Sequence, residues 1–385
     1  MKKIRIIATG DFHPNIRVEE KLQKTQDPHE LFGGALHLLQ SGDLTITNLE
    51  YPLTDCNEKL CKNGPYLKGH PSTISIIKSS GIDIISLANN HILNCCEQGL
   101  KDTLDICEAN GISTVGAGMT LEAAQKILYK EIKGVKISFI AFCECEFTVA
   151  TKNHGGAAPM DLIDNLQSIK EAKCNSDIVV VSVHGGNEFS HYPSPRIVKQ
   201  YRFYIDHGAS AIIAHHPHYI QGYEFYNGKP ILYSLCHLMF TRKKDPEALE
   251  VPIAELLIDP KTLEISVEFH FFRISLKETK LVELSQNEEM EMRKRFDHYC
   301  SVIKDPVKLA EEWKKYCKSH EDKYYKIIFL TPEITEYLCK KLRLTGIFTK
   351  LKSVYSRELL RLLNIIRCES HRDVVNSILS EDDQF

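Results

Sequence analysis

Short apolar runs alternate with helical patterns along the chain up to about residue 275. Several of these runs are continuous stretches rich in Ile and Val, which is typical of strands that are covered on both faces. We expect strands at residues 4–8, 44–50, 82–88, 136–142, 177–183, 211–215 and 229–235. Strands that alternate with helices in this way predict an α/β domain.

The helices between these strands have recognisable ends. Ser194 and Pro195 stand where an N-cap and a first helical residue are expected, and Gly208 stands where that helix should end. A second helix is expected in the segment after His91, ending at Gly111. These signals support the alternation of strands and helices.

The pattern changes in the last third of the chain. Residues 227–228, Asn-Gly, predict a hairpin, and residues 264–274 alternate with period two as a strand does. Beyond about residue 285, mixed charges flank helical stripes and the strand signals fade. We therefore expect an α/β domain over residues 1–280 and a helical extension over residues 285–385, packed on the first domain or on a partner protein.

Composition narrows the class of protein. The 48 Lys and Arg residues nearly balance the 51 Asp and Glu residues, and the net charge of −3 predicts no global attraction to nucleic acid or to an anionic membrane. The 13 scattered cysteines favour reduced thiols over a disulfide framework. The apolar stretch at the N-terminus is too short for a signal peptide or a membrane span. We expect a cytoplasmic protein.

Polar residues stand at the points where five of the expected strands end. Ligands gather at the carboxyl ends of strands in a wound sheet, so these residues are the candidates for chemistry. They are Asp11, His13, Asn48, Glu50, Asn89, Asn90, His91, His184, His215, His216 and His218. Each alone has an ordinary explanation, such as a turn or a hydrogen-bonded core histidine. Together, imidazoles and carboxylates at one edge predict a site for Zn, Mn, Fe or Ni. Their number favours two ions that share a bridging carboxylate.

The order of these residues resembles that of the calcineurin-like metallophosphoesterases. Longer segments resemble the CapA family of bacterial capsule or poly-γ-glutamate synthesis proteins, over roughly residues 4–240: TNLEYPLT, SLANNH, GLKDTLDICEANGISTVGAG, VHGGNEF and HHPHYIQGYEFYNGKPILYSL. The resemblance implies a four-layer sandwich of two sheets flanked by helices. It also implies a hydrolase in which two divalent ions, Mn, Zn or Fe, activate a bridging water to attack a phosphoester or a γ-glutamyl amide bond.

The resemblance also implies a role for each site residue. One ion would be held by Asp11, His13 and His218, the other by Asn90, His184 and His216, with Glu50 between them. His91 would protonate the leaving group, and Glu188 would face the substrate as a ligand partner or proton shuttle. Asn48, Asn89, His237 and Arg242 would bind an anionic small molecule or polymer. Pro217 restricts the backbone between His216 and His218, and His215 is left as a packing or supporting residue.

Four positions depart from the family pattern. Asn94 and Cys96 replace the acidic residue and glycine of the usual NNHxxDxG, so the residue near His91 can orient an imidazole but not stabilise its cation. Cys236 and His237 replace the usual glycine and asparagine after YSL. These departures keep a second function open, a non-catalytic accessory protein that binds metal or polymer and docks through its C-terminal helices.

Overall fold

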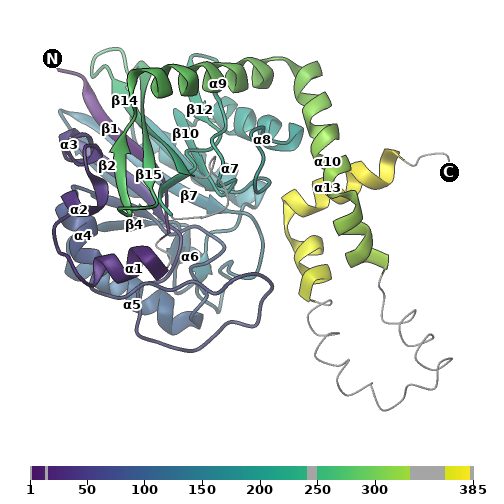
Figure 1. Ribbon diagram of the computed structural model, residues 1–385, viewed down its shortest axis with the longest axis horizontal. Coiled ribbons are helices and arrows are strands. Elements are labelled where there is room, and N and C mark those ends of the chain that lie inside the picture. Colours follow the sequence, from purple (N-terminus) through teal and green to yellow (C-terminus); the bar gives the residue numbers. More distant parts are fainter. Residues whose placement is uncertain (1, 14–15, 241–248, 330–359, 382–385) are drawn as a thin grey trace.

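Two large β-sheets pack against each other in the computed structural model, which describes residues 2–13, 16–240, 249–329 and 360–381 (Figure 1). The first sheet has the order β16-β15-β14-β1-β2-β3-β4, with β13 paired to β1. Its strands are β1 (Ile4–Phe12), β2 (Leu44–Leu49), β3 (Ile84–Ser86), β4 (Ser113–Val115), β13 (His237–Met239), β14 (Glu250–Ile258), β15 (Ile265–Ser275) and β16 (Lys280–Glu283).

The second sheet has the order β11-β12-β10-β9-β7-β6. Its strands are β6 (Leu128–Ile132), β7 (Val135–Cys143), β9 (Ile178–His184), β10 (Ala211–His215), β11 (Tyr223–Tyr226) and β12 (Lys229–Leu232). A small third sheet pairs β5 (Ala117–Gly118) with β8 (Gly156–Ala157). All the strands expected from the sequence are present, and the expected hairpin joins β11 to β12 in antiparallel register.

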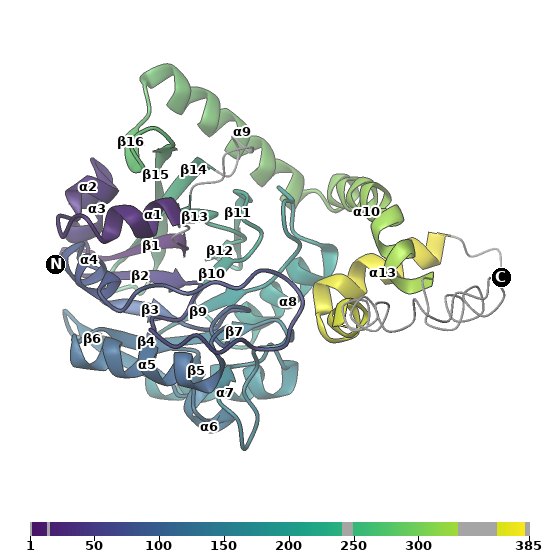
Figure 2. The same ribbon diagram turned by 60° about the horizontal axis from the view of Figure 1, so that its bottom comes forward.

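Helices cover the outer faces of both sheets (Figures 1 and 2). On the side of the first sheet lie α1 (Ile16–Leu22), α2 (His29–Phe32), α3 (Ala35–Ser41), α4 (Thr73–Ser79) and α5 (Cys96–Ala109). The remaining helices are α6 (Leu121–Ala124), α7 (Leu162–Asn175), α8 (Pro195–Asp206), α9 (Gln286–Lys304), α10 (Pro306–Phe329), residues 360–367 and α13 (Glu369–Glu381). The expected cap of α8 is confirmed, because the Ser194 side chain accepts from the backbone N–H of Ile197.

Alternation along β9 explains the layers. Val180 points into a core shared with the first sheet, whereas Val179 and Val181 point outward. There they pack with Ile169 of α7 and Tyr201 of α8. The sandwich of two sheets flanked by helices, with a C-terminal helical extension, is thereby confirmed.

The C-terminal helices belong to two packing units. Met292 and Phe296 of α9 lie in the same core as the two sheets. Helices α10 and α13 instead share a small core of their own, which includes Cys317, Tyr324 and Val374. In Figures 1 and 2 this pair lies at the end of the molecule beside α8.

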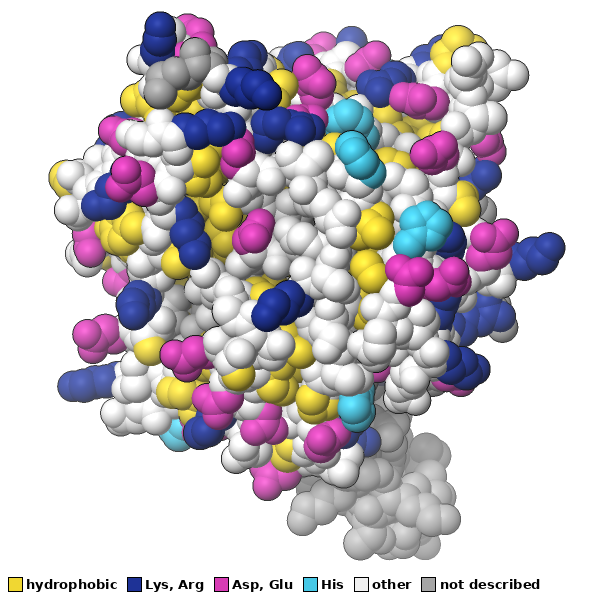
Figure 3. Space-filling model, turned by 90° about the vertical axis from the view of Figure 1, so that its left-hand side faces the viewer, with side chains coloured by type: hydrophobic (Ala, Val, Ile, Leu, Met, Phe, Trp, Pro, Cys, Tyr) yellow, Lys and Arg dark blue, Asp and Glu magenta, His cyan; other side chains and the backbone are white. Residues whose placement is uncertain are grey.

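The surface is mixed in charge. On the face shown in Figure 3, basic and acidic side chains are interspersed, as the near-zero net charge predicts. Among the described residues no helix combines the length and the apolar character that crossing a bilayer requires.

Candidate metal centre

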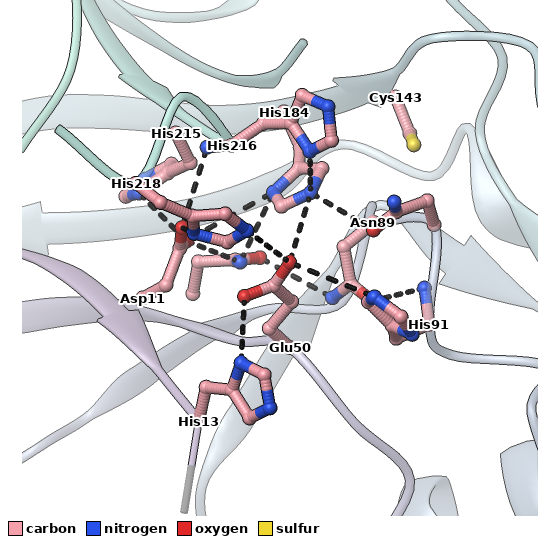
Figure 4. A network of polar contacts seen from close by, with 12 residues as sticks. Asp11, His13, Glu50, Asn89, His91, Cys143, His184, His215, His216 and His218 are labelled. Atoms are coloured by element: carbon pink, nitrogen blue, oxygen red, sulfur yellow. Dashed lines mark hydrogen bonds and ion pairs between the residues drawn. The ribbon is translucent and has the colours of Figure 1, made fainter. Parts of the chain in front are cut away.

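The carboxyl ends of strands from both sheets meet at one place. Strands β1 and β2 run parallel with Asp11 opposite Asn48, and β9 and β10 run parallel with His184 opposite His215. Parallel strands present their carboxyl ends at the same edge. Figure 4 shows the side chains from both pairs of strands converging on one another.

The backbone around Asp11 is tightly packed. A Cβ at Gly10 would lie 2.2 Å from the carbonyl oxygen of Leu235, so only glycine fits there. This close approach lets the Asp11 N–H donate to the Cys236 carbonyl at 2.9 Å. The two segments thereby fix the direction in which Asp11 projects.

The Asp11 carboxylate is fully buried and surrounded by nitrogen atoms. Its Oδ1 accepts a hydrogen bond from Asn48 Nδ2 at 2.7 Å and lies 3.4 Å from His215 Nδ1. Its Oδ2 lies 3.6 Å from His218 Nδ1. Burial by itself would raise the pKa of Asp11, but the contacts with His215 and His218 hold it well below its usual value. Asp11 is therefore an ionised, metal-competent carboxylate.

Glu50 is the most unusual group in the site. It is 0% exposed, and neither of its oxygens receives a hydrogen bond. The imidazole nitrogens that surround it at 3.4, 3.5, 3.7 and 4.0 Å belong to His13, His184, His218 and His91. A buried carboxylate with no donor is costly, and a carboxylate surrounded by imidazole nitrogens fits a bound divalent cation.

His184 contacts two further ligand candidates of the site. Its Nε2 lies 3.1 Å from His216 Nδ1 and 3.1 Å from Asn90 Oδ1. Burial, followed by the charge of His216, lowers the pKa of His184 well below its usual value. His184 is therefore neutral, the form in which imidazole binds a metal.

The loop that carries two of the histidines has an unfavourable backbone. His216 and His218 have φ angles of 96° and 59°, on either side of Pro217. Positive φ at a residue other than glycine costs about 1–3 kcal/mol and persists where the surroundings fix it. With this strained backbone, the imidazoles of His216 and His218 both lie in the same cluster of ligand atoms.

Three overlapping clusters of ligand atoms are buried in the part of the chain that the structure describes, with the atoms of each within 4.8 Å of one another. They are Asp11–His218–His237, Glu50–His216–His218 and Asp11–Glu50–His184. The residues therefore fit a metal centre, and the overlap at Asp11, Glu50 and His218 suits more than one ion. Cys143, at the edge of Figure 4, donates to the Glu144 carbonyl and is in none of these clusters.

His91 is held from one side by two donors. Its Nδ1 lies 3.0 Å from Asn94 Nδ2 and 3.3 Å from Lys62 Nζ. An ammonium can only donate, so Nδ1 accepts and the ring proton is on Nε2, which lies 4.0 Å from Glu50 Oε1. Burial, then the charge of Lys62, lowers the pKa of His91 well below its usual value. The sequence did not predict this shift, because both the burial of His91 and the position of Lys62 depend on the fold.

Lys62 was missed in the sequence. It is only 8% exposed, and burial lowers its pKa to about 8. No local signal distinguishes it from other loop lysines, because its position depends on how residues 56–68 fold back onto the site.

A cavity of about 210 Å³ adjoins the cluster. Its wall includes Asn90, His91, His216, Glu188 and Lys62. The Glu188 side chain, expected from the sequence to face the substrate, is one of these lining residues. Burial by the surrounding chain opposes its charge, but His216 and His218 lower the pKa of Glu188. A larger groove of about 930 Å³ beside α8 contains none of the clustered histidines.

Three of the residues expected to bind substrate lie elsewhere. Asn48, Asn89 and His237 are fully buried and do not line this cavity. Asn48 holds Asp11, Asn89 donates to Asn48 Oδ1 at 3.3 Å, and His237 stacks on His218 with ring centroids 4.8 Å apart. Asn48 and Asn89 therefore support the ligand candidates. His237 is itself placed to be a ligand, because β13 pairs with β1 and brings His237 opposite Asp11. Arg242 lies outside the described residues.

Comparison with known proteins places this site in a family context. Residues 5–242 match the family described as bacterial capsule synthesis protein PGA_cap. The chain is 32% identical over 237 residues to the PGA biosynthesis protein CapA of Bacillus subtilis (strain 168), covering 60% of this chain and 62% of that protein. It is 29% identical over 257 residues to the capsule biosynthesis protein CapA of Bacillus anthracis, covering 63% and 62%.

A third relative carries a different description. A probable polyglutamine synthesis accessory protein of Mycobacterium tuberculosis (strain ATCC 25618 / H37Rv) is 28% identical over 241 residues, covering 59% of this chain and 63% of that protein. The matched region thus spans less than two thirds of each of these relatives. The family match ends at residue 242, before β14 and the C-terminal helices.

Proposed function

Because this chain belongs to the bacterial capsule synthesis protein family PGA_cap, we propose that it is a metal-dependent hydrolase. Its substrate would be an anionic molecule or polymer of capsule or poly-γ-glutamate metabolism, the subject named in its relatives. The bond attacked would be a phosphoester or a γ-glutamyl amide.

The observation that carries this proposal is the buried Glu50 carboxylate, which receives no hydrogen bond although four imidazoles surround it. A site that served only folding would place a donor against such a group. A buried carboxylate gathered with four imidazoles and given no hydrogen bond instead favours a cation as the missing partner.

Two divalent ions are proposed, in the arrangement that the family resemblance implies. Asp11, His13 and His218 would hold one ion. Asn90, His184 and His216 would hold the second. Glu50 would lie between the two ions, and His237 is positioned to join the first set. Bound there, such ions would supply Lewis-acid activation of water and of the scissile bond.

The proposed proton donor is His91. Asn94 and Lys62 lie as donors beside its Nδ1, so the proton on Nε2 faces the centre. That proton would pass to a leaving group while Lys62 returns one to Nδ1, which keeps the imidazole neutral. The ammonium of Lys62 lies behind the ring and would stabilise negative charge that develops during bond cleavage. In this proposal the lysine provides the positive charge that a carboxylate-supported imidazolium would otherwise carry.

Glu188 would act at the pocket side of the centre. Since His216 and His218 lower its pKa, it stays ionised near neutral pH. An ionised carboxylate there can accept a hydrogen bond from the substrate or hold a proton during turnover.

A second function is favoured by one specific observation, the accessory description of the mycobacterial relative. In that case the chain would bind metal or polymer without hydrolysis and would support a synthesis complex.

Turnover assays separate the two functions. The purified full chain, loaded with Mn²⁺, Zn²⁺ or Fe²⁺, is tested on bis(p-nitrophenyl) phosphate and γ-glutamyl p-nitroanilide. We expect turnover that His91→Ala reduces at least a hundredfold with metal content unchanged. The exposed His154 provides the matched control, His154→Ala. Metal-loaded protein that cleaves neither probe would instead support the accessory function.

A further inference from the structure

The cavity beside the metal centre is shared between two parts of the chain. His91 and His216 line it from the family-matched region, and Tyr316, Lys323 and His371 line it from the C-terminal helices. The C-terminal helices are therefore part of the same pocket as the proposed ligands, rather than a separate appendage.

A buried carboxylate ties these helices to the loop that follows a metal-ligand candidate. Glu144 is 2% exposed and accepts from Gly186 N at 3.1 Å and from Ser370 Oγ at 2.7 Å. Arg196 forms ion pairs with both Glu144 and Asp373. Since Gly186 lies two residues after His184, α13 and the metal centre are fixed by the same network.

Further hydrogen bonds join α10 and α13 to residues 187–188 and to Cys145. The Tyr316 hydroxyl donates to the Glu188 carbonyl at 3.2 Å, and Asn187 Nδ2 donates to the Ser370 carbonyl at 3.2 Å. The backbone N–H of Cys145 donates to Glu369 Oε2 at 2.9 Å. The contacts are directional and reach both α10 and α13, so they define one position for this wall.

The wall itself is internally braced. Trp313 Nε1 donates to Ser377 Oγ at 2.8 Å, which joins α10 to α13. The Tyr324 hydroxyl lies 2.6 Å from His371 Nδ1, so two cavity-lining side chains from different helices support each other. Such bracing favours a preformed surface for a ligand.

The size and charge of the cavity indicate its ligand. At about 210 Å³ it is smaller than the ~300–1,000 Å³ of pockets that hold drug-sized molecules. Lys62 and Lys323 both line it, and of its two carboxylates Glu146 is already engaged by Asn90 Nδ2 at 2.9 Å. With metal ions alongside, the chamber suits a small anionic group.

Resting on the proposed function, we propose that α10 and the residues around His371 form the outer wall of the reaction pocket. The pocket would receive the anionic end group of a small molecule or chain, a phosphate or a carboxylate, and Lys323 would select for it. The interior of a polymer would be excluded, because a cavity of about 210 Å³ lined from both parts of the chain has room for an end group but not for residues on both sides of it.

Ligand titrations test this without turnover. Metal-loaded wild-type protein and Lys323→Ala are titrated calorimetrically with phenylphosphonate, L-glutamate and diphenyl phosphate. The first two ligands present a phosphate-like or carboxylate end group, whereas the third has its anion between two substituents. Lys315→Ala is the matched control, because Lys315 lies on the same helix, pairs with Glu312 and does not line the cavity.

We expect one end-group ligand to bind wild type at least tenfold more tightly than diphenyl phosphate, and its identity distinguishes a phosphate from a carboxylate substrate. Lys323→Ala should weaken that ligand at least tenfold, and Lys315→Ala should leave it unchanged. Equal binding of all three ligands, no binding of either end-group ligand, or an unaffected Lys323→Ala would overturn the inference. Metal content measured on the same samples shows separately whether the proposed metal site has failed.

Discussion

Replacing Glu50 by Gln should have opposite effects on stability with and without metal. In the metal-free protein the carboxylate is buried and receives no hydrogen bond. Burial lowers the pKa of His218, but Glu50 and Asp11 raise it to about 9 overall. One protonated imidazole therefore faces two carboxylates, and one negative charge stays uncompensated.

The magnitude follows from that imbalance. A buried polar group without a partner costs about 1–3 kcal/mol, so Glu50→Gln in EDTA should raise the free energy of unfolding by about 1–2 kcal/mol. With metal at 100 times its Kd, the wild-type protein should gain about 2.7 kcal/mol, and the variant should gain much less. The order of stability is therefore expected to reverse when metal is added.

Urea unfolding in EDTA and in saturating Mn²⁺ measures both differences. Glu144→Gln is the matched control, because this equally buried carboxylate is fully used by Gly186, Ser370 and Arg196. It should destabilise the protein by about 2–4 kcal/mol in both conditions. The reasoning about Glu50 is refuted if Glu50→Gln destabilises the metal-free protein as Glu144→Gln does.

Three further outcomes are expected. Lys62→Met should lower kcat about a hundredfold in steady-state assays, since one preorganised electrostatic contact is worth about 2.7–4 kcal/mol. An unchanged kcat would remove this lysine from the proposed chemistry. Asp373→Ala removes a partner of Arg196 and should make amide hydrogen exchange in α13 faster than in the wild type. Exchange at the wild-type rate would show that this ion pair does not hold the helix. Burial, then Lys323, lowers the pKa of His371 from 6.5 to about 4. The unfolded chain therefore takes up this proton first, and the free energy of unfolding falls as pH falls from about 6.5 to about 4. In His371→Gln the free energy of unfolding should depend less on pH in this range, and an unchanged dependence would contradict the assignment.

Local sequence signals predicted most of the fold. Strands β1, β2, β3, β7, β9, β10 and β12 are marked by apolar runs, and α8 is marked by Ser194 and Pro195, features that act within a few residues of the element itself. The short strands β4, β5, β6 and β8 carry no such run and were not expected. Strand β14 was not expected, because Pro252 and Glu255 interrupt its apolar pattern. The structure accommodates Glu255 by pairing it with Arg5 of the neighbouring β1.

The gathering of the site followed from topology. Asp11, Glu50 and His184 each end or follow a buried strand, so a wound sheet brings them to one edge. Lys62 and the wall around His371 could not be predicted in the same way. Their contribution depends on how a loop and a distant helix pack against that edge, which no local pattern encodes.

The roles of the supporting residues depended on burial. Asn48 and Asn89 are polar residues near a predicted site, and their sequence positions do not distinguish substrate contact from support of a ligand. In the folded chain both are fully buried and hydrogen-bonded to each other beneath Asp11. The low pKa of His91 was likewise hidden, because it comes from burial and from Lys62 rather than from its sequence neighbours.

Metal stoichiometry tests the central claim most directly. The full chain, purified under metal-replete conditions, should contain close to two transition-metal ions per chain by inductively coupled plasma mass spectrometry. Asp11→Asn and His216→Ala should each lose most of this metal, and the exposed-site control His154→Ala should retain it. A folded wild-type chain that binds no metal under these conditions would contradict the account.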